Sequence, residues 1–464
     1  MARNLRALTA GCLLVVAGAC SSFLTGEKLD SDPNRATSAQ AAQLFVASQV
    51  SAYYILTGHA ARVLAMWSQQ MAGTDRQYIG YDQYSVTEGL FGEFTSVYTG
   101  GGLVDHRAIQ ADAASSGNKT LVGIDKVWEA LIVGFAADNY GDIPYSEAVQ
   151  SDKPTPKLDP QLTVYAALQT LLDGAITDLQ ANQGVVGSLD LSLGGNNAAW
   201  IKVAHSLKAR LYMHTAEVNN GAYALALAQA QQGISSPAGD LNSRHRGPSG
   251  TGEENIWWQF IARDRDSYIR PGKFLVDLML SRNDPRVPLY FAKNDAGTYG
   301  GAAPGQGLDP NLHSNLSATR LVPEFPQPLI TWAETQGIIA EAAYRTGNVG
   351  LARSATDAIR ADAGLPPIAG SLSGAALLKQ ALEEKYIAIF QSTEVFQDYK
   401  RTCYPNLTPA TAASAAGIPA RFTYPVGERT ANPNIPEVGA QPKRNANDPA
   451  NATSVDGTAC LGQK

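Results

Sequence analysis

Long stretches of helical periodicity, separated by loops, constrain the fold of this 464-residue chain more than any other feature. Several stretches come in pairs, with small residues where neighbouring helices would touch. In one pair, Ala340 and Ala343 precede a break at Gly347–Asn348, and Ala352 and Ala355 follow it. Alanines at this spacing let two helices approach closely, so the pattern predicts a tetratricopeptide-like helical hairpin. We expect an all-α solenoid of such hairpins, with helices at about residues 39–72, 93–115, 119–138, 161–182, 197–218, 221–233, 331–346, 349–363 and 374–400.

Two segments interrupt this helical pattern. Residues 234–330 form a long insertion rich in Gly, Pro, Asn and aromatic residues, and residues 402–464 form an irregular C-terminal segment. Strand signals are few, and the best is 256–261, where aromatic and β-branched residues are dense. The helical parts therefore cover about 39–233 and 331–400. Because ligand sites on a helical scaffold tend to lie in its loops, we expect function in the insertion.

The first twenty residues have the features of a lipoprotein leader. Arg3 and Arg6 precede a short apolar run, and Cys20 directly follows the small residue Ala19. The Cys20 thiol can be acylated, and two or more acyl chains hold a protein firmly on a membrane. We therefore predict a signal peptide at 1–19, a lipidated N-terminus and tether at 20–38, and one domain at 39–464. The alternative is a cleaved, soluble secreted protein.

Composition excludes some partners and predicts one cross-link. The formal net charge of −6 argues against a nucleic-acid partner, and the low charged content of 17% predicts a polar, weakly charged surface. Beyond Cys20 only Cys403 and Cys460 remain, which is an even pair in an exported chain. We predict a disulfide between them. The alternative is two buried free thiols.

Catalytic and metal-binding motifs are missing from the sequence. It contains no HExxH, GxSxG, Walker loop or CxxC pair, and its six histidines lack metal-ligand spacing. Asp138 and Asp142 could suggest the paired carboxylates of a glycoside hydrolase, but they lie at a predicted helix end. We therefore predict no catalytic residue, no metal site and no cofactor. The one alternative left open is a calcium ion bound in a loop, with Asn294 and Asp295 as oxygen donors.

Aromatic loops are the better functional signal. Sugar rings stack their apolar C–H faces on aromatic rings, while their hydroxyls bind amides, carboxylates and arginine. Two regions have this composition, one after the first long helix and one in the insertion. Core packing is the competing explanation for each ring, and one of Trp257 and Trp258 is expected to face inward. The candidate ligand-binding residues are Tyr78, Tyr81, Tyr84, Trp258, Arg263, Asp266, Tyr268 and Tyr299.

Four ordered segments together resemble one protein family. Residues 135–148 contain Gly-Asp-Ile-Pro-Tyr followed by Ser-Glu-Ala, and the other segments are 332–342, 384–401 and 421–425 with Glu428 and Asn432-Pro433 beyond. In this order, beside a lipidation signal, they resemble the SusD/RagB family of outer-membrane nutrient-binding lipoproteins. The resemblance covers nearly the whole chain after the leader.

The residues of these segments have structural interpretations as well. Gly141 can adopt a left-handed conformation that ends a helix, Pro144 prevents the helix from resuming, and Asp142 can accept hydrogen bonds from the turn beside Tyr145. The third segment places Glu394, Asp398 and Arg401 on one helical face, which predicts an internal ion-pair network. We interpret these residues as architectural.

The resemblance implies a non-catalytic capture protein on the outer membrane that faces the cell exterior. Such a protein binds an oligosaccharide, or less commonly a peptide, and passes it to a SusC-like TonB-dependent transporter on which it sits as a lid. The resemblance gives the location of the glycan site only as two broad regions of loop aromatics. A surface hydrolase and a pure scaffold protein remain the other two hypotheses.

Overall fold

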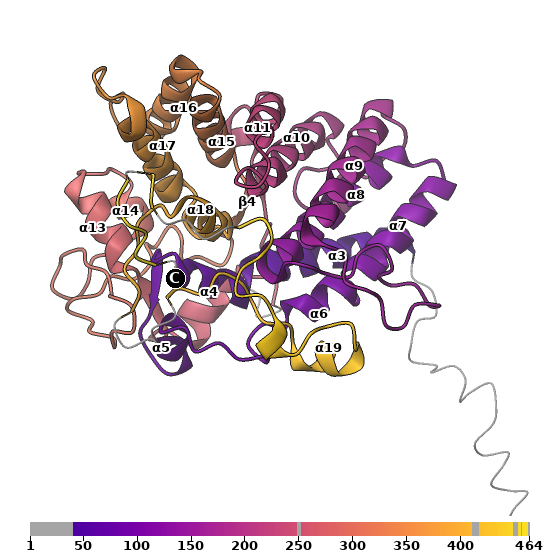
Figure 1. Ribbon diagram of the computed structural model, residues 1–464, viewed down its shortest axis with the longest axis horizontal. Coiled ribbons are helices and arrows are strands. Elements are labelled where there is room, and N and C mark those ends of the chain that lie inside the picture. Colours follow the sequence, from indigo (N-terminus) through magenta and orange to yellow (C-terminus); the bar gives the residue numbers. More distant parts are fainter. Residues whose placement is uncertain (1–39, 248–251, 411–416, 449–452, 456, 463–464) are drawn as a thin grey trace, which may run out of the picture.

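The structure is a computed structural model that describes residues 40–247, 252–410, 417–448, 453–455 and 457–462 (Figure 1). Cys20, the predicted signal peptide 1–19 and the tether 20–38 lie outside these residues. Helices dominate the described chain, and no closed sheet is formed among its few short strands. A search of the described helices for a membrane span, by length and hydropathy, finds none.

Helical hairpins form a continuous row across the upper part of the molecule in Figure 1. Within three hairpins the helices pack in pairs, and neighbouring hairpins pack through α9 on α10, α11 on α15, and α15 on α17. The all-α, tetratricopeptide-like fold is therefore confirmed. The helices of this row are α8 (Lys119–Tyr140), α9 (Gln161–Ala181), α10 (Asn197–His214), α11 (Ala222–Ala230), α15 (Trp332–Arg345), α16 (Val349–Asp362) and α17 (Gly374–Ala388).

The α15–α16 hairpin has the features that the sequence predicts. Ala340 and Ala355 are buried where the two helices meet. Gly347 has a φ of +85°, a left-handed conformation that suits glycine and turns the chain. The Asn348 side chain then accepts a hydrogen bond of 3.1 Å from the Leu351 amide and caps α16.

Some predicted helices are broken by close backbone contacts. At Gly58 a Cβ would lie 2.4 Å from the Tyr54 carbonyl oxygen, and at Gly102 it would lie 2.4 Å from that of Ser96. These glycines end one helix and begin the next because only a residue without a side chain fits. The resulting helices are α3 (Ala41–Thr57), α4 (His59–Trp67), α6 (Glu93–Tyr98) and α7 (Leu103–Ser115). The predicted run 374–400 also divides, without a glycine at the break, into α17 and α18 (Glu394–Thr402).

The predicted strand at 256–261 is wrong. The Asn255 side chain accepts hydrogen bonds from the amides of Trp257 and Trp258 and starts the helical turn α12 (Ile256–Trp258), which continues as the π-helical turn η3 (Gln259–Asp264). Trp257, Phe260 and Ile261 are the buried residues of this segment. Their spacing follows the helical period rather than the alternation of a strand.

Short strands tie the insertion to the helical body. β1 (Met71–Gly73) pairs antiparallel with β3 (Ile269–Pro271), with Met71 opposite Pro271. β2 (Leu241–Asn242) pairs with β4 (Pro328–Ile330). The β1–β3 pair brings the loop after the first helices next to the middle of the insertion, although the two are almost 200 residues apart. The remaining short elements are α5 (Gln77–Asp82), α13 (Lys273–Ser281), α14 (Val287–Tyr290), α19 (Val426–Ala431), η1 (Gly187–Leu189), η2 (Pro237–Gly239) and η4 (Val438–Ala440).

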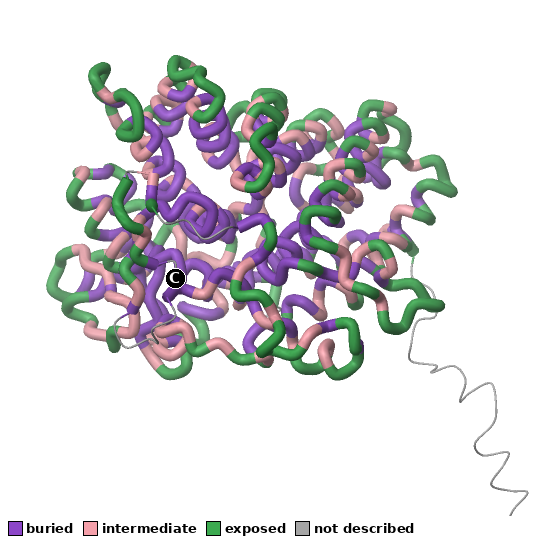
Figure 2. The backbone as a smooth tube through the Cα atoms, in the orientation of Figure 1, coloured by how far each residue is buried: buried purple, intermediate pink, exposed green. Residues whose placement is uncertain are grey.

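The buried residues lie where the helical row meets the lower part of the molecule, while the outer tips of the hairpins are exposed (Figure 2). The C-terminal segment crosses this region. Cys403 and Cys460 form the predicted disulfide, with their Cα atoms 6.0 Å apart. The disulfide joins the end of α18 to the last described residues of the chain.

Candidate functional site

The Gly-Asp-Ile-Pro-Tyr segment makes contacts within the protein. Gly141 ends α8 with a φ of +81°, and a Cβ there would lie 2.7 Å from the side-chain oxygen of Asn445. Asp142 accepts a hydrogen bond of 2.9 Å from the Gln161 amide at the start of α9, and Tyr145 donates one of 2.9 Å to Glu129. Pro144 is buried beside them. These contacts connect α8 to α9 and to the C-terminal segment.

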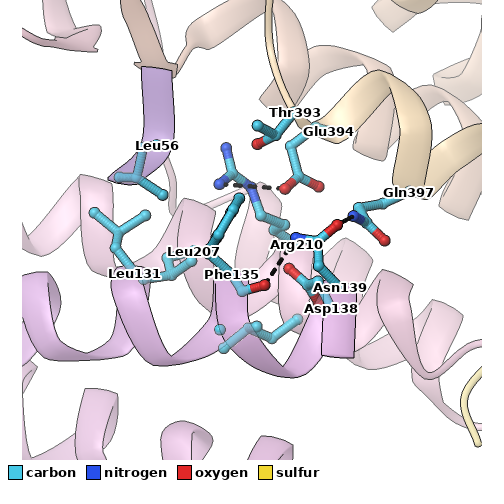
Figure 3. A pocket seen from close by; sticks show the side chains of 12 residues that line it. Leu56, Leu131, Phe135, Asp138, Asn139, Leu207, Arg210, Thr393, Glu394 and Gln397 are labelled. Atoms are coloured by element: carbon cyan, nitrogen blue, oxygen red, sulfur yellow. Dashed lines mark hydrogen bonds and ion pairs between the residues drawn. The ribbon is translucent and has the colours of Figure 1, made fainter. Parts of the chain in front are cut away.

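Glu394 lies in a buried polar cluster between α8, α10 and α18 (Figure 3). His214 contacts both its neighbouring acids, with Nε2 2.8 Å from Glu394 and Nδ1 2.7 Å from Asp138. Arg210 lies 3.5 Å from Glu394 and 2.6 Å from Glu334. Burial alone would lower the pKa of His214, but Asp138 and Glu394 raise it to about 9. Burial would raise the pKa of Glu394, but Arg210 and His214 lower it to about 2, so the cluster is an ion-pair network.

Asp398 and Arg401 belong to a second, adjacent network. Arg401 lies 2.6 Å from Glu341 and 3.0 Å from Asp398, which also pairs with Lys385 at 2.7 Å. The single network predicted for one face of α18 is therefore divided between two sets of partners. Both sets link α18 to the helical row.

The first cluster fits neither a metal site nor a hydrolase. The ligand atoms of Asp138, His214 and Glu394 lie within 4.8 Å of one another. A protonated His214 and Arg210 already supply the positive charge that a metal ion would bring. Asp138 is buried against His214, whereas Asp142 is exposed and caps α9, so these two acids do not face each other across an open cleft.

The β1–β3 pair brings the two predicted aromatic regions together. The ring centroid of Tyr78 lies 5.3 Å from that of Tyr81, 5.9 Å from that of Tyr268 and 5.0 Å from that of Phe260. His59 donates or accepts a hydrogen bond of 3.0 Å with the Tyr78 hydroxyl. Tyr78 is only 2% exposed and packs inside this aromatic cluster, while Tyr81 and Tyr268 are half-buried.

The other predicted residues are dispersed around this cluster. Tyr84 accepts a hydrogen bond of 3.2 Å from the Ala410 amide beside a separate cavity of about 420 Å³. Tyr299 is half-buried with the Lys293 ammonium 6.0 Å from its ring, and Asp266 is exposed and bonded to Asn315. Trp258 is half-buried, whereas its neighbour Trp257 is 1% exposed and faces inward.

In the predicted calcium loop, one of the two predicted ligand atoms already accepts hydrogen bonds within the protein. The Asn294 side-chain oxygen accepts hydrogen bonds of 2.9 and 3.0 Å from the amide and the hydroxyl of Thr298. Asp295 is exposed. Calcium at this loop remains a prediction.

A cavity of about 830 Å³ lies next to the aromatic cluster. One wall is the outer face of α3, the second is formed by residues 244–246 and 252–254, and the third is the segment 256–265 with Arg263. Phe260 connects the two features, because it lines the cavity and also packs on Tyr78. The Tyr54 side chain is 49% exposed and Val50 is 54% exposed, so apolar groups are available on the α3 wall.

The α3 wall and Arg62 were not foreseen as site residues. One sequence feature could have pointed to the α3 wall. Tyr53 and Tyr54 are adjacent on a helix, and adjacent residues of a helix point to different faces. One ring must then face away from the core, and this ring is Tyr54. Arg62 on α4 is buried beneath the cavity with its guanidinium 4.0 Å from the Phe260 ring centroid. No sequence pattern marks it.

Two histidines near the cavity are neutral at pH 7. Burial, and then the charge of Arg62, lower the pKa of His59 to about 4. Burial also lowers the pKa of His245, in the cavity wall, to about 4. The positive charge of this region therefore comes from arginine.

Comparison with solved structures places the fold among known proteins. A SusD-like protein from Bacteroides thetaiotaomicron VPI-5482 is similar with a TM-score of 0.73 and 21% identity, over 92% of this chain and 99% of that one. A SusD/RagB family protein from the same organism has a TM-score of 0.71 and 19% identity, over 86% and 95%. A chitin-binding SusD homolog from Flavobacterium johnsoniae has a TM-score of 0.72 and 18% identity, over 86% and 98%.

Sequence comparison gives the family. A search of curated protein sequences finds no match. The profile of the SusD-like family, described as starch-binding and associating with the outer membrane, matches residues 33–425. This match spans most of the chain and agrees with the helical fold and with the four ordered segments. The chain belongs to the SusD-like family of starch-binding proteins that associate with the outer membrane.

Proposed function

We propose that this protein captures an oligosaccharide at the cell surface and delivers it to a SusC-like TonB-dependent transporter. The observation that carries this proposal is the 830 Å³ cavity between α3, residues 244–246 and 252–254, and residues 256–265. Its volume lies in the range of small-molecule sites, and it combines exposed apolar groups with several charged and polar side chains.

The chemistry of the cavity suits a sugar. Tyr54 offers an exposed ring on which the C–H face of a pyranose can stack, and Val50 lies one helical turn before it. Gln259 and Arg263 belong to the wall formed by residues 256–265 and can hydrogen-bond hydroxyl groups. Asp138 and Asp142, the paired acids considered above, lie outside this cavity lining, so the proposal includes no bond cleavage.

Family membership supports the rest of the proposal. Members of the SusD-like family are non-catalytic binding proteins of the outer-membrane surface, and the family implies a SusC-like partner. For this chain, anchoring through lipidated Cys20 and docking on such a transporter are proposals. Two structurally similar proteins are described as chitin-binding, which favours a saccharide over the alternative peptide ligand.

Calorimetric titration of the mature chain with oligosaccharides of several backbones tests the capture step. Replacing Tyr54 with alanine should weaken binding about tenfold, because an exposed stacking ring contributes on the order of 1 kcal/mol. Leu225→Ala on α11 is the matched control, since this exposed side chain lies outside the cavity lining. Failure of every oligosaccharide to bind, with binding of peptides instead, would replace the proposal by the peptide alternative.

Fractionation and pull-down test the remaining steps. The native protein should be found in the outer-membrane fraction and should co-purify with a TonB-dependent transporter. Cys20→Ala should release it from the membrane, because the acyl chains supply the anchoring free energy. Recovery of the native protein without any transporter would contradict the delivery step while leaving ligand capture intact.

A further inference from the structure

Charge in the cavity wall is opposite in sign to that of the whole protein. Five arginines line the cavity, against the three acids Glu253, Glu254 and Asp264. The complete chain has a formal net charge of −6. A positive cavity attracts anions even in a protein of negative net charge, because its low-dielectric walls focus the electric field of the arginines inside the cavity. The five arginines are Arg62, Arg244, Arg246, Arg263 and Arg265.

Acids within the protein neutralise only some of these arginines. Arg263 lies 2.9 Å from Asp264, and Arg265 shares the same carboxylate at 3.7 Å. Among the described residues, no ion pair within 4.0 Å is formed by Arg62, Arg244 or Arg246. The three guanidinium groups keep their charge at any physiological pH.

Arg62 is buried with an unused donor, and its charge also acts on the buried carboxylate of Glu93, which lies beyond ion-pair distance. The Arg62 side chain is 7% exposed, its Nε donates a hydrogen bond of 3.3 Å to Tyr78, and its plane lies over Phe260. Its Nη1 has no hydrogen-bond partner among the described residues. A buried guanidinium with an unused donor is costly, so a bound anion near it would be favoured.

We propose that the cavity selects an acidic saccharide, whose carboxylate or sulfate group is bound by Arg62, Arg244 and Arg246 while its ring stacks on Tyr54. This inference rests on the proposed function, since it names the class of oligosaccharide that the same cavity captures. A guanidinium group can donate two parallel hydrogen bonds to the paired oxygens of a carboxylate or of a sulfate, so the same arginines can recognise either group on a saccharide. The aromatic and apolar α3 wall supplies the ring contact that a free anion would not need.

The test compares charged and neutral forms of the same sugar. The mature chain is titrated with oligogalacturonate, its neutral methyl ester, chondroitin sulfate oligosaccharides and their desulfated form. The proposal predicts that at least one acidic form binds about tenfold or more tightly than its neutral form, with a loss of affinity as salt rises. The two pairs of ligands distinguish a carboxylate from a sulfate as the recognised group.

Variants assign the effect to the cavity. The double variant Arg244→Gln/Arg246→Gln should reduce affinity for the acidic form about tenfold and leave affinity for the neutral form within about twofold. Both residues are exposed, so the fold should be retained. Lys119→Gln/Lys153→Gln removes the same two charges from exposed sites outside the cavity lining and should change neither affinity.

The outcomes separate this inference from the function on which it rests. Equal binding of acidic and neutral forms would overturn the inference while the capture of oligosaccharides stands. Tenfold preference for the acidic form that survives in the double arginine variant would also overturn it. Binding of acidic peptides in place of all saccharides would overturn both.

Discussion

Arginine has opposite roles in two regions of this protein. The two adjacent ion-pair networks around Glu394 and Arg401 are here called the closed network. In it, Arg210 and Arg401 each lie 2.6 Å from a buried glutamate. In the cavity beside α3, Arg62, Arg244 and Arg246 form no ion pair with the described residues. The first region has satisfied its charges within the fold. The second holds positive charge that a ligand can neutralise. We therefore expect the first region to contribute to folding stability and the second to ligand binding.

Burial and partners explain why the two regions differ. The closed network lies between helices α8, α10, α15 and α18, which bring its acids and bases together. Figure 3 shows the part of it that contains Asp138, Arg210 and Glu394. The cavity is bounded by α3, by Arg62 of α4, by loop residues and by the short helical turns α12 and η3. Substitutions in the network should therefore change folding stability, and those in the cavity should change affinity. Four predictions test this division, from the largest expected effect to the smallest.

Removing Glu394 should have the largest effect. Glu394→Ala leaves Arg210 and His214 buried with one acid fewer, and the free energy of unfolding should fall by about 3–5 kcal/mol. Urea denaturation measures this change. The control is Asp264→Ala at the exposed cavity rim, which should leave the urea midpoint unchanged. Similar midpoints for the two variants would remove the distinction between the regions.

Opening the disulfide should have the next largest effect. Cys403 and Cys460 are 57 residues apart, and replacing both by serine should reduce the free energy of unfolding by about 2–4 kcal/mol, because the unfolded chain gains conformational freedom. Differential scanning calorimetry measures the loss. Oligosaccharide affinity should not change, since neither cysteine lines the cavity. A parallel loss of affinity in folded protein would show that the two regions are coupled.

Alkaline pH should weaken the closed network. The pKa of His214 is raised from 6.5 to about 9 in the folded protein, so the protonated form is stabilised by folding. This contribution is fully present below pH 6.5 and is lost as pH rises through 9, with a total of about 3 kcal/mol. Unfolding free energies measured from pH 6 to pH 10 should show the decline. The decline should be missing in His214→Gln, and its persistence there would assign it to another group.

Replacing Asp82 should stabilise the protein by a smaller amount. Asp82 is the buried last residue of α5, and its carboxylate accepts hydrogen bonds of 3.0 Å from the amides of Gly73 and Gly305. Burial raises its pKa from 3.8 to about 7, so its ionisation opposes folding increasingly as pH rises from 3.8 to 7 and by the full amount above pH 7. Asp82→Asn keeps an acceptor oxygen and cannot ionise.

Its unfolding free energy at pH 8 should therefore exceed that of the original protein by about 1 kcal/mol, and the gain should vanish at pH 4. Thermal melts at the two pH values measure this difference. A loss of stability at pH 8 would mean that the carboxylate charge is compensated in the folded protein, as it is in the closed network.

Local sequence patterns were sufficient for much of the fold. Small residues around Gly347 predicted the α15–α16 hairpin because both the turn and the close approach depend on neighbouring residues. The breaks at Gly58 and Gly102 could not be predicted, since they arise from contacts that exist only after the helices have formed. The strand prediction at 256–261 failed because the Asn255 side chain caps a helix, and its preference overrode the aromatic composition.

The candidate site was less predictable than the fold. Tyr78 and Tyr268 were predicted in two separate aromatic regions, and the β1–β3 pair brings them close together, but Tyr78 is buried in packing. Tyr54 and Arg62 were missed because they lie on helices that the sequence marks only as scaffold. Whether a helix face is exposed depends on what other segments cover it. That information is carried by tertiary contacts rather than by the pattern of the helix itself.

The β1–β3 pair has an evolutionary consequence. Its backbone hydrogen bonds hold the insertion on the helical body and depend little on which side chains the two strands carry. Side chains around the cavity can therefore be exchanged by mutation without loss of the frame that presents them. The same fold occurs in proteins that share only about 20% identity with this chain, which agrees with a frame that depends little on individual side chains.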